Sequence, residues 1–162
     1  MTFAVHNLAG AQPIANTSTT QAHALGTIVR ATDPTYGEGE FIYLLGVGST
    51  VAGSLCTYNA STWATTLLAN TASLGLPVVR AMSANVASQY GWYMESGVTT
   101  VTKGATTVAA GARLFVAASG ACSSTAASGK EILGMICGAS AASATTTITV
   151  TLMRPKAQGS AV

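Results

Sequence analysis

The segment at residues 147–153 alternates polar and apolar residues, and this alternation constrains the fold more than any other feature of the chain. It reads Thr-Ile-Thr-Val-Thr-Leu-Met, which places Ile148, Val150 and Leu152 on one face. Successive side chains of a strand point to opposite sides, so such a pattern is typical of a strand with one buried face. The segment therefore predicts a half-buried β-strand.

Short segments of β-forming residues recur along the rest of the chain, separated by glycine and turn residues. Residues 41–45 are aromatic and branched with glycine close on both sides, which favours a buried strand over a helix. Residues 33–37, which contain Pro34 and Gly37, predict a turn, and residues 59–61 predict a hairpin turn. The other predicted strands are residues 25–31, 54–58, 63–68, 78–82, 91–95, 98–102, 114–117 and 132–137.

Evidence for helices is weak. Thr and Val are frequent, and both lose χ1 freedom in a helix, while the 17 glycines interrupt any long helical run. Residues 83–89 and 139–144 are compatible with one helical turn or with a loose loop. The expected fold class is therefore all-β, built from short antiparallel strands.

Two pairs of segments resemble each other in the same order along the chain. Residues 50–58 resemble residues 107–116, each a turn marked by glycine that leads into a strand. Residues 78–84 resemble residues 132–138, each an apolar strand followed by small residues. A duplicated β unit explains this order, and two such units would shield each other's edges. Chance similarity in a sequence of low diversity is the alternative.

The chain divides into three predicted regions. Residues 1–24 are rich in Asn, Thr, Gln and Ala, lack periodicity, and predict an extended N-terminal arm. The arm either becomes ordered on a partner or is a frayed terminus. Residues 25–153 form the predicted β-rich core domain, and residues 154–162 a short C-terminal tail. The apolar residues of the arm are Phe3, Val5, Leu8 and Ile14.

Charge is scarce in this chain. Charged residues make up 7% of the sequence, where about 25% is typical. Either much of the surface is covered by partners, or the protein tolerates a neutral surface rich in hydroxyl groups. The net charge is +2, and the closest basic pair is Arg154 and Lys156. A nucleic-acid partner is not expected, because such binding needs a concentrated basic face.

The sequence predicts no catalytic, cofactor-binding or metal-binding residues, and we expect that the protein is not an enzyme. Glu38 and Glu40 would share one face of a strand, and we interpret them as solvated residues beside a turn. His6 and His23 lie in the predicted arm, where a histidine is a poor general base. The remaining acidic residues are Asp33, Glu95 and Glu131.

Cysteines and aromatic residues are interpreted as structural. Three cysteines at wide spacing, Cys56, Cys122 and Cys137, predict small buried thiols in a reducing compartment. Residues 90–93, Tyr-Gly-Trp-Tyr, form the densest aromatic cluster, and the strand pattern around Trp92 favours a place in the core over an interface.

The chain shows neither a secretory signal nor a membrane span. No basic segment followed by an apolar run opens the sequence. The apolar stretches at residues 105–122 and 132–144 are short or interrupted, whereas a membrane helix needs about 20 apolar residues. We expect synthesis in the cytoplasm, with the protein staying soluble there or leaving by cell lysis, and no membrane partner.

Four segments of the chain resemble segments of capsid decoration proteins, also called cement proteins, of tailed bacteriophages. They are residues 38–47, 84–93, 110–116 and 132–134. The resemblance extends over roughly residues 25–153 and contains no specific signature, so it implies no binding residues. It implies a small β-barrel-like or β-tulip-like domain on the outer surface of a virion capsid. There the protein would bind the major capsid protein at subunit junctions and stabilise the shell. It would also associate with itself as a homotrimer or homodimer.

Three other readings compete with this one. A tail or fibre component that binds a host surface is the principal alternative. A β-barrel that carries apolar ligands would need a roomy pocket, whereas 6% aromatic residues and many alanines predict a tight core. A hydrolase with a cysteine nucleophile is the third.

Overall fold

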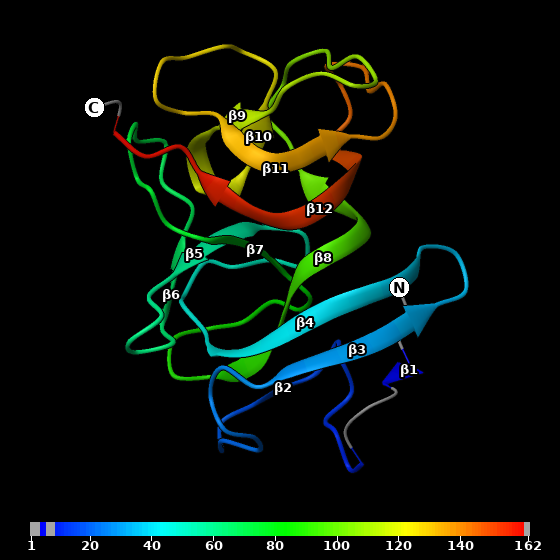
Figure 1. Cartoon of the computed structure of the whole chain (residues 1–162), viewed down its shortest axis with the longest axis vertical. Helices are drawn as coiled ribbons and strands as arrows, with labels where there is room; N and C mark the ends of the chain where they lie inside the picture. Colours follow the sequence, from blue (N-terminus) through cyan, green and yellow to red (C-terminus); the bar gives the residue numbers. More distant parts are fainter. Residues whose placement is uncertain (1–3, 6–8, 161–162) are drawn as a thin grey trace.

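The structure is a computed structural model that describes residues 4–5 and 9–160, and almost all of its regular elements are antiparallel β-strands (Figure 1). Within this described part the helical structure is limited to a 3₁₀ turn, η1 (Ala118–Gly120). The predicted all-β class is therefore confirmed. The strands are β1 (Ala4–Val5), β2 (Thr17–Ser18), β3 (Ile28–Asp33), β4 (Gly37–Leu45), β5 (Leu55–Tyr58), β6 (Thr65–Leu67), β7 (Val78–Ala81), β8 (Tyr90–Thr102), β9 (Phe115–Val116), β10 (Cys122–Ser123), β11 (Ile132–Cys137) and β12 (Thr147–Ala157).

Strand β8 is the central element, because it pairs with four other strands. Its first half pairs with β4, and its second half pairs with β12 from Ser96 to Thr102. Strands β2 and β7 pair with shorter parts of it. Figure 1 shows β3 and β4 in the lower half of the molecule and β11 and β12 in the upper half, with β8 passing from one to the other.

Gly97 allows β8 to continue between the two halves. Its φ is +118°, and a Cβ there would lie 2.7 Å from the carbonyl oxygen of Glu38. A side chain would clash with β4, so this close approach of two backbones requires glycine. The two strands predicted at residues 91–95 and 98–102 are therefore one strand.

Five strands surround a small apolar core in the order β4–β8–β7–β5–β6. The end of β4 returns to the start of β6 through a bridge between Leu45 and Ala64, where Leu45 N–H donates to the carbonyl of Trp63 at 3.0 Å. This junction is an isolated bridge, so the ring is not a continuous closed ladder. The small core consists of Ile42, Leu44, Cys56, Val79, Ala81 and Tyr93.

A larger core lies on the other face of the same strands and extends beneath β11 and β12. Alternation along β4 sends Phe41 and Tyr43 into this core, whereas their neighbours face the small one. Trp92 is fully buried in it, as its strand pattern predicted. Ile148, Val150 and Leu152 also enter it, which confirms the buried face predicted from the alternation at residues 147–153.

The two pairs of similar segments make corresponding contacts in the structure. Gly53 N–H donates to the carbonyl of Ala81 at the end of β7, and Gly111 N–H donates to that of Cys137 at the end of β11, both at 2.9 Å. β5 is antiparallel to β7, and an antiparallel bridge likewise joins Phe115 to the residue before β11. β7 then pairs with β8, and β11 pairs with β12.

The predicted arm packs against the core domain over its described residues. β2 pairs with β8, and Ile14 is 3% exposed. The indole nitrogen of Trp92 donates to the carbonyl of Gln12 at 2.9 Å, so the segment supplies a hydrogen-bond acceptor that the buried ring needs. The side chains of Phe3, Val5 and Leu8 lie outside the described part.

The predicted C-terminal tail begins too early. Strand β12 continues past Met153 to Ala157, which pairs with Ile132 of β11. Arg154 has a φ of +46°, and this left-handed residue shifts the strand so that pairing resumes beyond Pro155. The alternation ends there, which explains why the sequence pattern did not reveal the continuation.

Candidate functional site

An irregularity between β11 and β12 shapes one hollow on the surface of the molecule. Leu133 pairs with Lys156 and Met135 with Leu152, so Gly134 alone faces residues 153–155. Gly134 has a φ of +76°, and a Cβ there would lie 2.9 Å from the carbonyl oxygen of Met153. The bulge therefore depends on glycine at this position, and bulges commonly redirect the side chains beside them.

Three large apolar side chains are exposed around the bulge, and we call them the apolar patch. They are Leu133, Ile136 and Met153, which are 37%, 47% and 51% exposed. All three line one hollow of about 280 Å³, together with the backbone of β11 and the loop at residues 111–113. The bulge places Leu133 and Ile136 on the same outer face of β11, although an unbroken strand would point them to opposite faces.

An ion pair lies at the rim of this hollow. Nη1 of Arg113 is 3.5 Å from Oε2 of Glu131, and the Arg113 side chain is 77% exposed. An apolar centre with charged residues at its edge is the usual arrangement of a protein-binding surface, since the centre excludes water and the rim fixes orientation. The chemistry available here is contact with another apolar surface.

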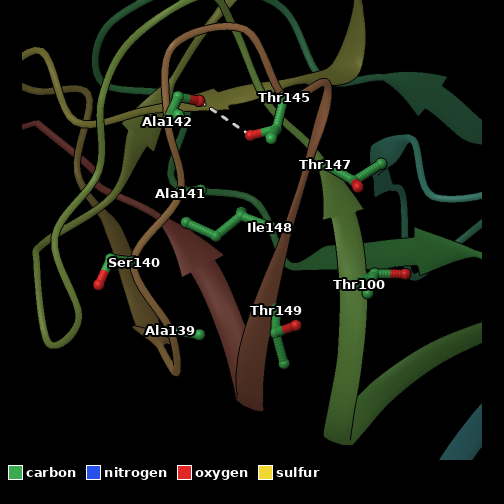
Figure 2. A pocket seen from close by; sticks show the side chains of 9 residues that line it. All are labelled: Thr100, Ala139, Ser140, Ala141, Ala142, Thr145, Thr147, Ile148 and Thr149. Atoms are coloured by element: carbon green, nitrogen blue, oxygen red, sulfur yellow. Dashed lines mark hydrogen bonds between the residues drawn. The ribbon is translucent and has the colours of Figure 1, made fainter.

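A second hollow, of about 220 Å³, lies beside the first half of β12 (Figure 2). Figure 2 shows the loop at residues 139–145 on one side, where Thr145 Oγ1 donates to the carbonyl of Ala142 at 2.9 Å, and Thr100 of β8 on the other. Every lining side chain is Thr, Ser, Ala or Ile, so hydroxyl and methyl contacts are what this surface offers.

Four charged residues form a cluster where β3, β4, β8 and β12 meet. Glu40 accepts hydrogen bonds from Arg154 at 2.8 Å and from Arg30 at 2.9 Å, and these two guanidinium groups lower its pKa. Glu38 is exposed as expected, but the expectation that Glu40 is simply solvated is wrong. A basic partner from a distant strand is not visible in the local sequence.

Glu95 belongs to the same cluster but is more buried. It is 6% exposed, and its Oε1 lies 3.4 Å from Nη2 of Arg154. Burial raises the pKa of Glu95, the charge of Arg154 opposes this shift, and the nearby Glu40 reinforces it. The pKa of Arg154 is raised, chiefly by its hydrogen bond to Glu40. The cluster therefore joins the last strand, β12, to β4 and β8, and joins β4 to β3.

His23 is held in place by the aromatic residues that the predicted arm covers. Its Nε2 accepts a hydrogen bond from the backbone N–H of Gln12 at 3.0 Å, and its ring centroid lies 5.1 Å from that of Tyr43 and 5.4 Å from that of Trp92. His23 is therefore part of the packing between arm and sheet. His6 lies outside the described residues.

The three cysteines are free, buried thiols, as the sequence predicted. Burial raises the pKa of Cys56 to about 12 and that of Cys122 to about 12. Thiols with such pKa values stay protonated near neutral pH and are weak nucleophiles. Across residues 4–5 and 9–160, no three side chains of His, Cys, Asp or Glu gather as metal ligands.

Sequence reasoning did not predict the apolar patch. Its one local signal is Gly134 in the middle of an apolar run, since glycine inside a strand pattern often marks a bulge.

The chain matches no protein-family model, and no curated protein is similar to it. Nowhere in the described part is there a helix of the length and apolar character that crossing a membrane requires.

Proposed function

We propose that the protein is a structural component of a tailed bacteriophage that binds the outer face of the capsid at subunit junctions and stabilises the shell. Affinity in such a role comes from the quality of apolar contacts and from repetition over many symmetric sites. The observation that supports the proposal is the apolar patch of Leu133, Ile136 and Met153, which forms an open hollow on a hydrogen-bonded sheet.

Two further observations favour this role. With 7% charged residues, the chain has little charge to keep its surface apart from other proteins, which suits a protein that works in contact with a lattice. Other apolar residues form the two cores. The apolar side chains of the patch lie outside these cores and are exposed, so they are available for a partner.

Antibody labelling of purified virions tests the proposal. Antibodies raised against the isolated protein should label the heads of virions obtained from cultures in which the gene is expressed. Label confined to tails or fibres would contradict capsid decoration and favour the alternative of a host-binding tail component. Virions without any label would refute both virion roles.

A binding assay with undecorated heads then tests the patch. Heads from a phage mutant lacking this gene are incubated with the protein, pelleted and analysed for bound protein. Met153→Ser should reduce occupancy, whereas Val51→Ser, at an exposed apolar residue outside the patch, should not. Equal occupancy of both variants would show that the capsid contact lies elsewhere.

A further inference from the structure

Charged residues are scarce in this chain, yet they are concentrated in one place. The sequence contains seven basic and five acidic residues, and five of these twelve line two adjoining hollows. They are Arg30, Glu38, Glu40, Glu95 and Arg154. The hollow of the apolar patch is lined by other residues, so a capsid contact through that patch does not account for this concentration of charge.

The smaller of the two hollows, of about 140 Å³, lies where four strands meet, and we call it the Tyr58 hollow. Tyr58 ends β5, residues 77–79 begin at the start of β7, Glu95 lies in β8, and Arg154 and Pro155 lie in β12. Most of this lining is apolar, with one carboxylate and one guanidinium among it. Small molecules usually bind in such concave, mostly apolar sites, where rigid strands position a few polar groups.

Glu95 brings an unsatisfied acceptor to the Tyr58 hollow. Within the described part no group donates a hydrogen bond to its Oε1, although Nη2 of Arg154 lies 3.4 Å away. A buried carboxylate oxygen without a hydrogen bond costs free energy, so a ligand that donates to it gains affinity. Arg154 supplies the opposite chemistry, because a guanidinium has five N–H donors and can bind Glu40 while it donates to a ligand.

Tyr58 supplies an aromatic surface that a second ring supports. Its ring stacks on that of Trp63, with the centroids 6.1 Å apart and an angle of 20° between the planes. Trp63 has a φ of +57°, a left-handed conformation that is unusual for an aromatic residue and occurs most often at functional sites. Burial and, after it, the charge of Glu95 raise the pKa of Tyr58, so the phenol lies near that carboxylate.

An aromatic surface beside one acceptor and one donor fits a neutral sugar ring. Oε1 of Glu95 and Nη2 of Arg154 lie side by side, so one hydroxyl of a vicinal diol can donate to the carboxylate while its neighbour accepts from the guanidinium. The C–H face of the same ring would pack on Tyr58. A cationic ligand would be repelled by Arg154 and an anionic one by Glu95, which favours a neutral ligand.

The larger hollow, of about 240 Å³, continues the site beyond one sugar ring. It is lined by Arg30, Glu38, Gly39, Glu40 and Ser96. Glu40 accepts from Arg154 at 2.8 Å, and because each of these two residues lines one hollow, their ion pair lies between the hollows. A ligand that fills the Tyr58 hollow and extends past this ion pair would meet a second, more polar set of hydrogen-bonding groups.

From these contacts we propose that the two hollows bind a neutral oligosaccharide. One pyranose ring lies against Tyr58 with vicinal hydroxyls on Glu95 and Arg154, and the next sugar residue lies in the larger hollow beside Glu38. The proposal goes beyond the proposed function and does not depend on it, because the hollow of the apolar patch has a separate lining.

An NMR titration of the full chain tests the proposal. The probes are methyl α-mannopyranoside, methyl α-glucopyranoside and methyl β-galactopyranoside. At least one should shift the amide resonances of Tyr58, Glu95 and Arg154 in a saturable way, with a Kd of about 1–10 mM, the range expected for a ligand of this size. Cyclohexanol has a ring but no vicinal diol, and it should bind at least about tenfold more weakly. A disaccharide of the best probe should also shift Glu38.

Substitutions separate the roles of the ring and the carboxylate. Tyr58→Ala should weaken binding at least about tenfold, whereas Tyr58→Phe, which keeps the ring, should stay within about threefold. Glu95→Gln should weaken binding about tenfold, because a hydrogen bond to a charged group becomes one to a neutral group. Tyr36→Ala, at a tyrosine that lines neither hollow, is the control and should bind as the unsubstituted protein does. Amide spectra that overlay away from the hollows show that each variant is folded.

The outcomes that overturn the proposal are specific. They are no saturable shift with any of the three glycosides, shifts confined to residues outside the two hollows, or cyclohexanol that binds as tightly as the glycosides. Undiminished binding by both Tyr58→Ala and Glu95→Gln would overturn it as well. Tyr58→Ala should keep full occupancy on undecorated heads, and Met153→Ser should keep full sugar binding, so each proposal can fail without the other.

Discussion

Arg154 donates from Nη2 to Oε2 of Glu40 across 2.8 Å, although 114 positions separate the two residues in the chain. The contact exists because β12 bulges at Arg154, whose backbone is left-handed with a φ of +46°. The same bulge exposes Met153 to solvent as part of the apolar patch. One local distortion thus joins the last strand to β4 and builds the candidate binding surface.

Two substitutions at Arg154 should separate the backbone conformation from the ion pairs. Alanine removes the side-chain contacts and keeps an unfavourable left-handed conformation, whereas glycine removes the same contacts and adopts that conformation without strain. We expect Arg154→Gly to unfold at a higher urea concentration than Arg154→Ala. Equal midpoints would mean that the strand relaxes at this residue when its ion pairs are lost.

The two carboxylates of the cluster should affect stability in opposite directions as pH changes. Burial raises the pKa of Glu95 above its ordinary value of 4.5, so its ionisation costs stability that grows as pH rises from about that value. The pKa of Glu40 is lowered by its two arginine partners, so its stabilisation is present above 4.5 and is lost as pH falls through the lowered pKa.

We therefore expect the change in the free energy of unfolding caused by Glu95→Gln to be more stabilising at about pH 7 than at about pH 4, as measured by urea unfolding. Glu40→Gln should destabilise the protein at about pH 7 and have little effect at about pH 2. If Glu95→Gln destabilised the protein most at neutral pH, the ion pair with Arg154 would outweigh the cost of burial.

Gly134 should tolerate alanine much less than Gly111 does. Both have a similar left-handed backbone, with φ of +76° and +74°, so both substitutions cost about 1–2 kcal/mol for conformation. At Gly134 the added Cβ also meets the carbonyl oxygen of Met153 at 2.9 Å, whereas at Gly111 nothing lies within 4 Å. The difference between the two free energies of unfolding measures how tightly the bulge is packed.

Ile14 should anchor the N-terminal segment to the sheet. It is 3% exposed within the large core, so Ile14→Ala should lower the free energy of unfolding by about 2–4 kcal/mol. Ile28, which is 44% exposed, is the control, and its replacement by alanine should cost about 0.5 kcal/mol or less. Calorimetry checks both values, and equal effects would contradict the packing of this segment.

The three thiols should resist chemical modification until the protein unfolds. All are buried, and burial raises the pKa of Cys56 and of Cys122 to about 12. A disulfide reagent at about pH 8 should therefore react slowly with the native protein and rapidly in denaturant, because the thiolate is the reactive form. Rapid reaction of one thiol under native conditions would reveal local opening around it.

Strand positions were predictable where side-chain chemistry alone determines them. The segment 132–137 coincides with β11, and the alternation at 147–153 correctly identified the buried face of β12. The break predicted near Gly97 was wrong, because glycine there allows β4 to approach closely and does not end the strand. Local sequence does not distinguish these two uses of glycine.

The candidate site could not be derived from the sequence, because its residues become neighbours only through pairing. Leu133 and Ile136 share a face since a bulge intervenes, and Met153 joins them from a strand predicted to end at that residue. The contact of Arg154 with Glu40 depends on the same bulge. Pairing register is a property of the whole sheet, so no short window of sequence contains it.

The passage of β8 through both halves of the fold has a thermodynamic consequence. Its residues contribute to the small core through Tyr93 and to the large core through Trp92 and Val101, so detaching it opens both at once. Neither half retains a complete sheet without it. Heating or denaturant should therefore melt the molecule in one cooperative step, and a protease should find no stable half to release.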